Sequence, residues 1–453
     1  MYEILSLFSV FNPHLSTSQI RQFSCIVIGL LSMTGRVSML NLSRWTPEGG
    51  SYRTVQRFFN TVVFPWGALC WVFFRTYLFD RNSEYILAGD ESVVRKSGAA
   101  TYGLSRFFSS TVGKTIPGIA FLSLSLVSVK DRRSYPMVME QVVRDPASST
   151  PGTPVSESRP DPQIPAARRK PGRPKGSRNR KKTQVVLSAT LRQLQTMLKA
   201  LLTHIGGLIP VRYLVLDGYF GHNNALQMTR QCGMHLISKL RSNTVLYFLP
   251  TSPGGPGPGR PRLYGDRFNP QQIDAKYRVS TDRQADITTE VYQATLRHKK
   301  FPDPLNVVCI LKTHLRTGKK SHVLLFSSDA TATAEKIIDC YALRFQIEFN
   351  FREAKQYWGL EDFMNVKQTP VTNAANLSMF MVNVSAKLLE PARVALPEAS
   401  VLDLKAHYRG LKYSSETLKI LPQKPDPIVI QQITERLGSI GAIHQIPTQP
   451  NAP

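Results

Sequence analysis

Hydrophobic periodicity divides the chain into helical and strand-like regions. Residues 1–80 contain apolar runs behind Ser or Thr, as in STSQIRQFSCIVIGLLSM and SYRTVQRFF, which predicts a helical N-terminal region. From residue 84 the runs become shorter and richer in β-branched residues. The segments EYILAGDES, KTIPGIAFLSLSLVSV and SYPMVMEQVV predict three sequential strands in an antiparallel meander. A mixed α/β chain that begins with helices is expected.

A proline-rich and basic segment, residues 145–186, separates these strands from the next ones. Its composition predicts a disordered loop. The chain then alternates between helix and strand, with an amphipathic helix in TLRQLQTMLKALLTHIGGL, a buried strand in VRYLVLDGYF, a helix in HNNALQMTRQCG and a strand in MHLISKLRS.

The remaining chain predicts three further regions. Residues 244–328 carry strand-like segments between turns and predict a β-rich insertion. Residues 329–365 predict a helix that completes the α/β domain begun in residues 84–243. Residues 366–453 predict a helical C-terminal region, which is a candidate for a dimer contact.

The segment YALRFQIEFNFREAKQ, residues 341–356, contains four polar residues whose spacing is informative. Tyr341, Arg344, Glu348 and Lys355 lie at offsets 0, 3, 7 and 14. At ~100° per residue these offsets fall on one narrow stripe of a single continuous helix. An ordinary solvated face of a core helix would give such a stripe, so the segment needs support from elsewhere in the chain.

The charge of the chain favours a polyanionic partner. There are 57 Lys and Arg against 31 Asp and Glu, a net charge of +26. Ribosomal and membrane-surface proteins carry similar charge, but no signal peptide pattern and no uninterrupted apolar run of membrane-spanning length is visible. We therefore expect a soluble cytoplasmic protein without a membrane partner.

The five cysteines encode neither a zinc cage nor a disulfide framework. Their number is odd, they are widely separated, and no CxxC pair occurs. Each has apolar neighbours in the sequence, so buried thiols are expected.

Three acidic residues stand out by their position. Asp90 lies in the first strand and Asp217 follows a central strand, while Glu348 belongs to the helical stripe. Side chains at the carboxyl ends of strands border the functional crevice of an α/β sheet. Three hard oxygen ligands suit Mg²⁺ or Mn²⁺, and two such ions ~4 Å apart can support phosphodiester chemistry. Taken singly, each aspartate is more commonly a turn or cap residue.

The order strand-Asp, strand-Asp, helix-Glu, with a β-insertion before the glutamate, resembles the RNase H-like fold of DDE transposases. The spacing Tyr341-x2-Arg344-x3-Glu348-x6-Lys355 resembles the Tyr-Arg-Glu-Lys signature of the bacterial insertion-sequence-four family. The resemblance covers residues 84–360, and SYRTVQRFF is similar to that family's N-terminal region.

The resemblance implies a role for each of these residues. Asp90, Asp217 and Glu348 would be catalytic and would hold two Mg²⁺ ions, for which Mn²⁺ could substitute. Tyr341, Arg344 and Lys355 would contact phosphates of the transposon end, so the cations would face the DNA while the glutamate faces the metal. The family implies a transposase that binds terminal inverted repeats, cleaves DNA and transfers the freed strand into target DNA. It also implies a homodimer in the DNA complex and a nucleoid-associated location.

Further cations are candidate DNA contacts. They are Lys239 and Arg241 after one strand, Arg53 and Arg57 in SYRTVQRFF, and Arg173 and Lys175 in the basic loop. A helix that packs by its aromatic residues Tyr52, Phe58 and Phe59 would present Arg53 and Arg57 to phosphates. The loop sequence RRKPGRPKGSRNRKK resembles an AT-hook, but Pro171 replaces the usual Arg, and a nonspecific phosphate tether is the alternative.

Two other functions fit the same sequence. The first is a nuclease of the same fold that cuts DNA without joining it. The second is a DNA-binding protein derived from a transposase and catalytically silent, against which the presence of all three acidic residues argues.

Overall fold

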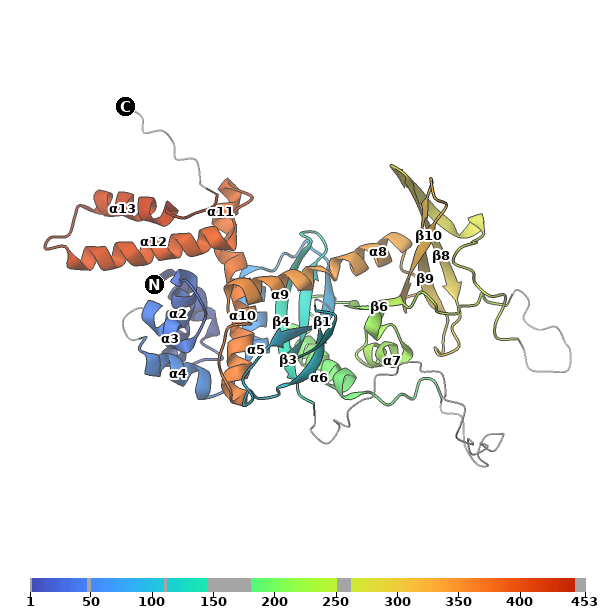
Figure 1. Cartoon of the computed structure of the whole chain (residues 1–453), viewed down its shortest axis with the longest axis horizontal. Helices are drawn as coiled ribbons and strands as arrows, with labels where there is room; N and C mark the ends of the chain where they lie inside the picture. Colours follow the sequence, from blue (N-terminus) through green and yellow to red (C-terminus); the bar gives the residue numbers. More distant parts are fainter. Residues whose placement is uncertain (1, 47–49, 110–111, 145–180, 251–261, 445–453) are drawn as a thin grey trace.

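The computed structural model describes residues 2–46, 50–109, 112–144, 181–250 and 262–444. Figure 1 shows a central body of sheet and helices, with a strand-rich projection at one end and a pair of helices at the other. Within the described residues, no helix is both long and apolar enough to cross a membrane.

The N-terminal region is helical, as its periodicity predicts. Ser16 caps one of these helices in a capping box with Gln19, and Ser38 and Ser51 cap two others. The helices are α1 (Tyr2–Phe8), α2 (Thr17–Ser32), α3 (Met39–Trp45), α4 (Tyr52–Asn60) and α5 (Trp66–Tyr77).

One large mixed sheet forms the centre of the molecule. Its order is β2-β3-β1-β5-β6-β10-β9-β8-β7, with β4 also paired to β3. The strands are β1 (Tyr85–Arg95), β2 (Ser105–Ser109), β3 (Lys114–Ser128), β4 (Arg133–Val142), β5 (Tyr213–Leu216), β6 (His235–Leu240), β7 (Arg278–Gln284), β8 (Ile287–Leu296), β9 (Leu305–His314) and β10 (Lys320–Ser327). The three predicted N-terminal strands are β1, β3 and β4, and β2 was not predicted.

The pairing directions differ between the strands at the centre of the sheet. Strand β3 runs antiparallel to β1 and β4, whereas β5 runs parallel to its two neighbours, β1 and β6. Helices cover both faces: α6 (Ala189–Ile205) packs Leu194, Leu198 and Leu201 on one face, and α8 (Ala334–Leu343) packs Ile337 and Leu343 on the other. This mixed sheet with flanking helices confirms the RNase H-like fold.

The strands predicted between residues 278 and 327 are present and extend the same sheet. Strand β10 pairs antiparallel with β6, and β9, β8 and β7 follow outwards. Figure 1 shows them projecting from the body, and every residue of β7 is exposed. The proposed division of the chain into domains remains a prediction.

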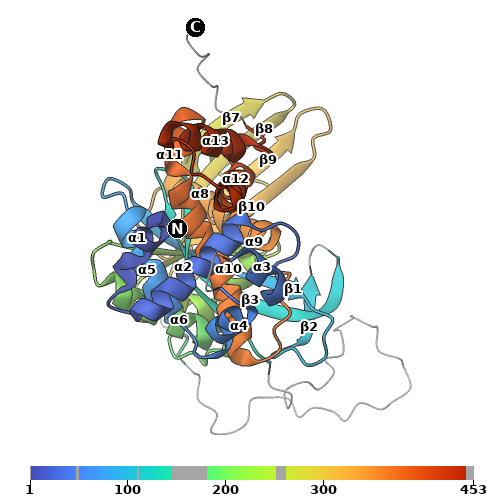
Figure 2. The same ribbon diagram turned by 90° about the vertical axis from the view of Figure 1, so that its left-hand side faces the viewer.

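Helix α10 (Gln368–Leu388) joins the N-terminal helices to the sheet. Figure 2 places it beside α2, α3 and α4, and nearly all of its residues are buried. The Phe380 ring lies among those of Phe8, Phe11, Phe23 and Phe73, at centroid distances of 5.3–6.0 Å. The apolar segment MFMVNVSAKLL is therefore used within the monomer.

The other C-terminal helices are α9 (Gln346–Tyr357), α11 (Glu390–Ala395), α12 (Val401–Ile420) and α13 (Pro427–Ser439). Two further short elements are α7 (Asn223–Gln231) and the 3₁₀ turn η3 (Gly218–Phe220). All five cysteines are free; Cys70, Cys309 and Cys340 are buried as expected, while Cys25 and Cys232 are only half-buried.

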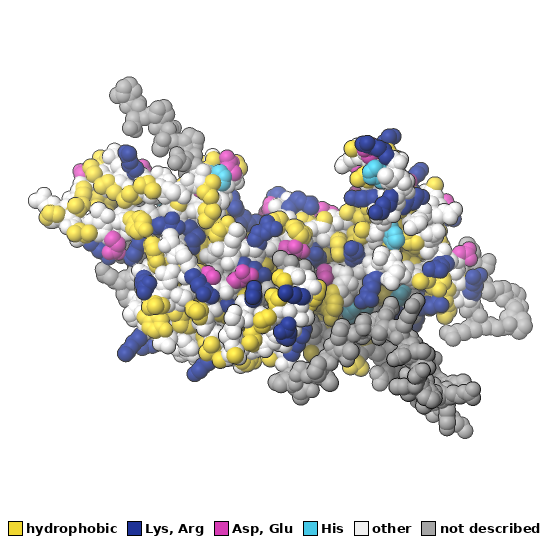
Figure 3. All heavy atoms as spheres, in the orientation of Figure 1, with side chains coloured by type: hydrophobic (Ala, Val, Ile, Leu, Met, Phe, Trp, Pro, Cys, Tyr) yellow, Lys and Arg dark blue, Asp and Glu magenta, His cyan; other side chains and the backbone are white. Residues whose placement is uncertain are grey.

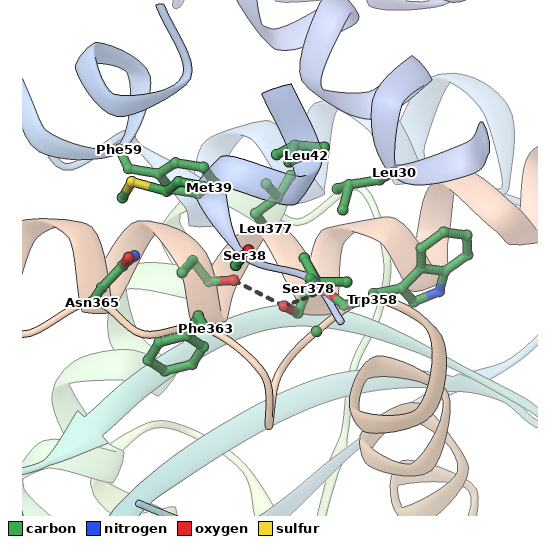
Figure 4. Close-up of a pocket in the computed structure, with 13 residues that line it drawn as sticks. Leu30, Ser38, Met39, Leu42, Phe59, Trp358, Phe363, Asn365, Leu377 and Ser378 are labelled. Carbon is green, nitrogen blue, oxygen red and sulfur yellow. Dashed lines mark hydrogen bonds between the residues drawn. The ribbon is translucent and has the colours of Figure 1, made fainter. Parts of the chain in front are cut away.

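The N-terminal helices approach the end of α9 closely at Gly359. Figure 4 shows the apolar crevice there, lined by residues of α3, α10 and the loop after α9. The Ser378 hydroxyl donates to the Trp358 carbonyl at 2.8 Å. Gly359 has a φ of +82°, and a Cβ built on it would lie 2.4 Å from Val37 Cβ. Both the backbone conformation and the close approach require glycine.

We predict that Gly359→Ala lowers the free energy of unfolding by about 3 kcal/mol, because left-handed strain and overpacking add. Gly318→Ala is the matched control, since Gly318 has a φ of +66° and a Cβ added to it would meet no atom within 4 Å. The control should lose only about 1 kcal/mol. Chemical denaturation measures both, and equal losses would show that the contact with Val37 is unimportant.

Candidate active site

Asp90 and Asp217 lie side by side at the point where the parallel pairing of β1 and β5 ends. The last paired residues are Gly89 and Leu216; Asp90 is the next residue of β1, and Asp217 is the first residue after β5. Asp217 also caps η3, since its Oδ1 accepts a hydrogen bond from the Tyr219 amide at 3.2 Å. Strand register therefore brings together two acids that are 127 residues apart in the sequence.

The turn after Asp217 is held against β6. The Asp217 carbonyl accepts a hydrogen bond from the Ser238 hydroxyl at 2.7 Å. Gly221 lies so near to β6 that a Cβ on it would be 2.1 Å from the Lys239 carbonyl oxygen. Lys239 and Arg241 are consequently fixed beside the Asp217 turn.

Glu348 reaches this region from α9, but the single continuous helix expected over residues 341–356 is wrong. Helix α8 ends at Leu343 and α9 begins at Gln346. At this break the amide of Phe345, and those of Ile347 and Glu348 in the first turn of α9, each bond to the carbonyl three residues earlier. A turn of this 3₁₀ type advances by three residues instead of 3.6, so the angular extrapolation fails across Arg344.

Arg344 occupies the centre of the site. Its Nη1 lies 2.9 Å from Asp90 Oδ2, and its Nη2 lies 3.4 Å from Glu348 Oε1. Its guanidinium carbon lies 5.9 Å from the centre of the Tyr341 ring. The Arg344 side chain is only 13% exposed, whereas that of Glu348 is 41% exposed, so the guanidinium bridges a mostly buried and a partly exposed carboxylate. In this arrangement the guanidinium faces Asp90 and Glu348, and the expected contact of Arg344 with DNA stays a prediction.

The carboxylates share one electrostatic environment. Burial raises the pKa of Asp90, the Arg344 charge and the Glu91 amide oppose the rise, and the charges of Asp217 and Glu348 add to it. Burial lowers the pKa of Arg344, but Asp90, Tyr341 and Glu348 outweigh that effect and raise it. Arg344 therefore stays charged and offsets mutual repulsion among the three acids.

Lys355 also points inwards. Its Nζ donates to the Val93 carbonyl of β1 at 3.2 Å and lies 3.4 Å from Glu361 Oε1. Its side chain is 26% exposed. Lys355 therefore has partners within the protein, and its expected contact with DNA stays a prediction.

A hollow of about 670 Å³ opens beside Asp217. It gathers five residues that the sequence analysis proposed for the site, together with several that it missed. The former are Asp217, Lys239, Arg241, Tyr341 and Arg344, and the latter include Ser242, Asn243 and His322. The His322 Nε2 lies 3.1 Å from the Ser242 carbonyl oxygen. Cations, an aromatic hydroxyl and a catalytic candidate thus share one surface depression.

The surroundings of the hollow are basic. Lys239, Arg241 and Arg344 line it. Figure 3 shows further Lys and Arg side chains gathered on the projecting strands, with acidic side chains interspersed over the central body. Such a surface attracts a polyanion and makes its binding dependent on salt.

The other proposed DNA contacts lie elsewhere. Arg53 and Arg57 are exposed on α4, which packs by the buried Phe58 and Phe59, whereas Tyr52 is 44% exposed and is not part of that packing. Figure 1 places α4 on the far side of the body from α8. Arg173 and Lys175 lie outside the described residues.

The donor set suits a hard divalent cation, because it consists of carboxylate oxygens. Asp90 and Asp217 are neighbours, and Glu348 approaches the same point through Arg344. Within the ranges that the structure describes, however, no three Asp, Glu, His or Cys side chains are already close enough to hold one ion. The three acids provide the oxygen ligands that a divalent ion prefers, and they lie in one region of the structure. The Arg344 guanidinium occupies the position of a cation between Asp90 and Glu348.

Two further residues near the site were not identified from the sequence. Glu91 follows Asp90, and its pKa is raised by burial and by the charges of Asp90 and Asp217, although Arg144 opposes the rise. Asn350 is buried on α9 and donates to the hydroxyls of Ser134 at 2.7 Å and Ser125 at 3.3 Å. Asn350 therefore fixes the helix that carries Glu348 to β3 and the start of β4.

Comparison with known families shows which family the chain belongs to. A family model described as DDE superfamily endonuclease matches residues 10–298, which is 289 of the 453 residues. The chain belongs to this family, which supports a nuclease or transposase-type enzyme with DNA as its substrate. The match includes Asp90 and Asp217 and ends before Glu348. A search of curated proteins finds no match.

We predict that Asn350→Ala lowers the free energy of unfolding by about 2 kcal/mol, because two buried hydroxyls lose their donor. Gln356→Ala, at an exposed position of the same helix, should change it by less than about 0.5 kcal/mol. Urea denaturation compares the two variants. Equal stability of both would show that the Asn350 bonds do not anchor α9.

Proposed function

We propose that the protein is an insertion-sequence transposase that binds terminal inverted repeats, cleaves DNA strands and transfers them into target DNA. The observation that carries the proposal is the meeting of Asp90 and Asp217 at the end of the β1–β5 pairing, with Glu348 joined to Asp90 through Arg344. Membership of the DDE superfamily endonuclease family supports it.

The chemistry needs no protein nucleophile. Two divalent ions, Mg²⁺ or Mn²⁺, would activate water or a 3′-hydroxyl and stabilise the oxygen that leaves phosphorus. Asp90, Asp217 and Glu348 would hold the ions. In the first step water would add to phosphorus and the P–O3′ bond would break, leaving a 3′-hydroxyl and a 5′-phosphate. In the second, that 3′-hydroxyl would attack a phosphodiester of target DNA, so that a new P–O3′ bond forms while the target's own 3′-oxygen leaves as a hydroxyl.

The hollow beside Asp217 would receive the DNA near the cut. Lys239 and Arg241 reach it from β6 and the following turn, and Tyr341 borders it from α8. Arginine can contact a phosphate through two nitrogen atoms, whereas lysine acts as a compact charge. Arg53 and Arg57 on α4 would contact a more distant part of the duplex.

The finer assignment rests on the sequence. The spacing of Tyr341, Arg344, Glu348 and Lys355 supports the insertion-sequence-four family, which implies a homodimer in the DNA complex. Periodicity and composition support the domain division given above and a cytoplasmic location. The exposed apolar residues of the α12–α13 pair support a protein contact there, namely Ile420, Leu421, Ile428 and Val429.

We predict that Glu348→Gln cuts DNA at least ~100-fold more slowly and binds the terminal repeats as wild type does, because it removes a charged metal ligand but no cation. A labelled duplex with the DNA that flanks the gene, incubated with Mg²⁺ or EDTA, measures cutting and binding. Glu335→Gln, at an exposed acid in the first turn of α8, is the control and should cut normally.

The cutting pattern separates the three candidate functions. Metal-dependent nicks at discrete repeat ends, followed by joining, support a transposase. Cuts scattered along the duplex favour a nuclease, and binding without any cut in the wild type favours a silent DNA-binding protein. Normal cutting by Glu348→Gln would refute the proposed role of Glu348.

We also predict that Lys239→Ala and Arg241→Ala each weaken DNA binding. Each should make the slope of log affinity against log salt shallower by about 0.9, the value for one phosphate contact on duplex DNA. Fluorescence anisotropy at several salt concentrations gives the slopes. Lys424→Ala, in the segment between α12 and α13, should leave the slope unchanged. Unaltered slopes for both site variants would place the DNA elsewhere.

A further inference from the structure

The Arg344 guanidinium contacts two carboxylates, but these do not accept hydrogen bonds from all of its donors. Its two terminal nitrogens contact Asp90 and Glu348, yet its Nε is buried without a hydrogen-bond partner. A buried donor without a partner is costly, so the internal position is a compromise. The longer contact, 3.4 Å to Glu348, is also the weaker of the two.

The position of Arg344 conflicts with a cation at the same carboxylates. A guanidinium and a divalent ion both require the negative oxygens of Asp90 and Glu348, and both cannot occupy the space between them. The ion carries twice the charge and coordinates directly. The carboxylates can therefore exchange one positive partner for the other.

A route outwards exists for the displaced side chain. Arg344 borders the hollow that also contains Lys239 and Arg241, and it lies on the turn between α8 and α9 instead of within a helix. In that hollow its whole guanidinium fork, including Nε, can donate to a phosphate.

From this geometry we infer that Arg344 is an exchangeable counter-ion that couples metal binding to DNA binding. It neutralises Asp90 and Glu348 until divalent ions take these carboxylates, and it then contacts a DNA phosphate in the hollow. The inference rests on the proposed function, since it concerns the same site. Arg344 is thus a positioning residue in the absence of ions and a DNA ligand in their presence.

Direct measurement of Mn²⁺ binding to the full chain without DNA tests the competition. Electron paramagnetic resonance reports free Mn²⁺ during a titration of wild type, Arg344→Gln and Arg344→Lys. Arg344→Gln should bind Mn²⁺ about tenfold more tightly than wild type, and Arg344→Lys should lie between them, because one ammonium cannot bridge both carboxylates. Arg352→Gln, an exposed arginine on α9, is the control and should match wild type.

The same titration with a terminal-repeat duplex tests the coupling. Linkage requires that DNA and Mn²⁺ each tighten the binding of the other by an equal factor. This factor should be severalfold in wild type and near one in Arg344→Gln. A circular dichroism melt of each variant confirms that it is folded, and Asp90→Asn combined with Arg344→Gln should abolish the tight binding.

The outcomes separate this inference from the proposed function. Unchanged or weaker Mn²⁺ binding in both Arg344 variants, with binding still dependent on Asp90, would overturn the exchange and leave the metal site intact. No Mn²⁺ binding in any variant would overturn both. Tighter Mn²⁺ binding in Arg344→Gln, together with a wild type that never cuts DNA, would support the exchange and refute the transposase.

Discussion

The parallel pairing of β1 with β5 is the constraint on which the site depends. It ends at Gly89 and Leu216, so Asp90 within β1 and Asp217 directly after β5 lie beside each other where the two strands part. Antiparallel β3 covers the other side of β1 along its whole length and leaves the strand no freedom to shift. A slip of one residue would turn Asp90 to the opposite face.

The third acid is positioned by packing rather than by strand pairing. Helix α9 is fastened to the sheet by Asn350 and packs against α10, which in turn is enclosed by the N-terminal helices. Gly359 then allows the chain to pass close to Val37. The N-terminal helices therefore support the position of Glu348 although they contribute no residue to the carboxylate cluster.

Local sequence patterns were sufficient to predict most helices and strands and to place Asp90 and Asp217 in the same region of the sheet. The β-rich segments, the capped helices and the two strand-end aspartates depend on local residue order, which periodicity reads directly. Short β2 has only five residues and was missed. The break between α8 and α9 was also missed, because no glycine or proline marks it. The residue types that favour helix continue across Arg344.

Side-chain directions could not be predicted in the same way. Arg344 contacts Asp90 on β1, while Lys355 contacts the Val93 carbonyl on β1 and Glu361 after α9. These partners are at least six residues away in the sequence, and only the folded chain brings them together. Glu348, the other partner of Arg344, is closer in the sequence. His322 and Asn243 join the hollow because β10 pairs with β6. This pairing lies beyond any local pattern. The net positive charge of the sequence indicated a polyanionic partner. The fold determines which Lys and Arg side chains can reach that partner.

Iron-mediated cleavage of the polypeptide tests most directly the central claim that Asp90, Asp217 and Glu348 form one metal site. Fe²⁺ bound in place of Mg²⁺ generates hydroxyl radicals with ascorbate and peroxide, and these radicals cut the backbone nearest to the ion. The account predicts fragments that end near residues 90, 217 and 348, suppressed by excess Mg²⁺ and absent in Asp90→Asn. Fragments that end elsewhere, or that persist unchanged in Asp90→Asn, would contradict it.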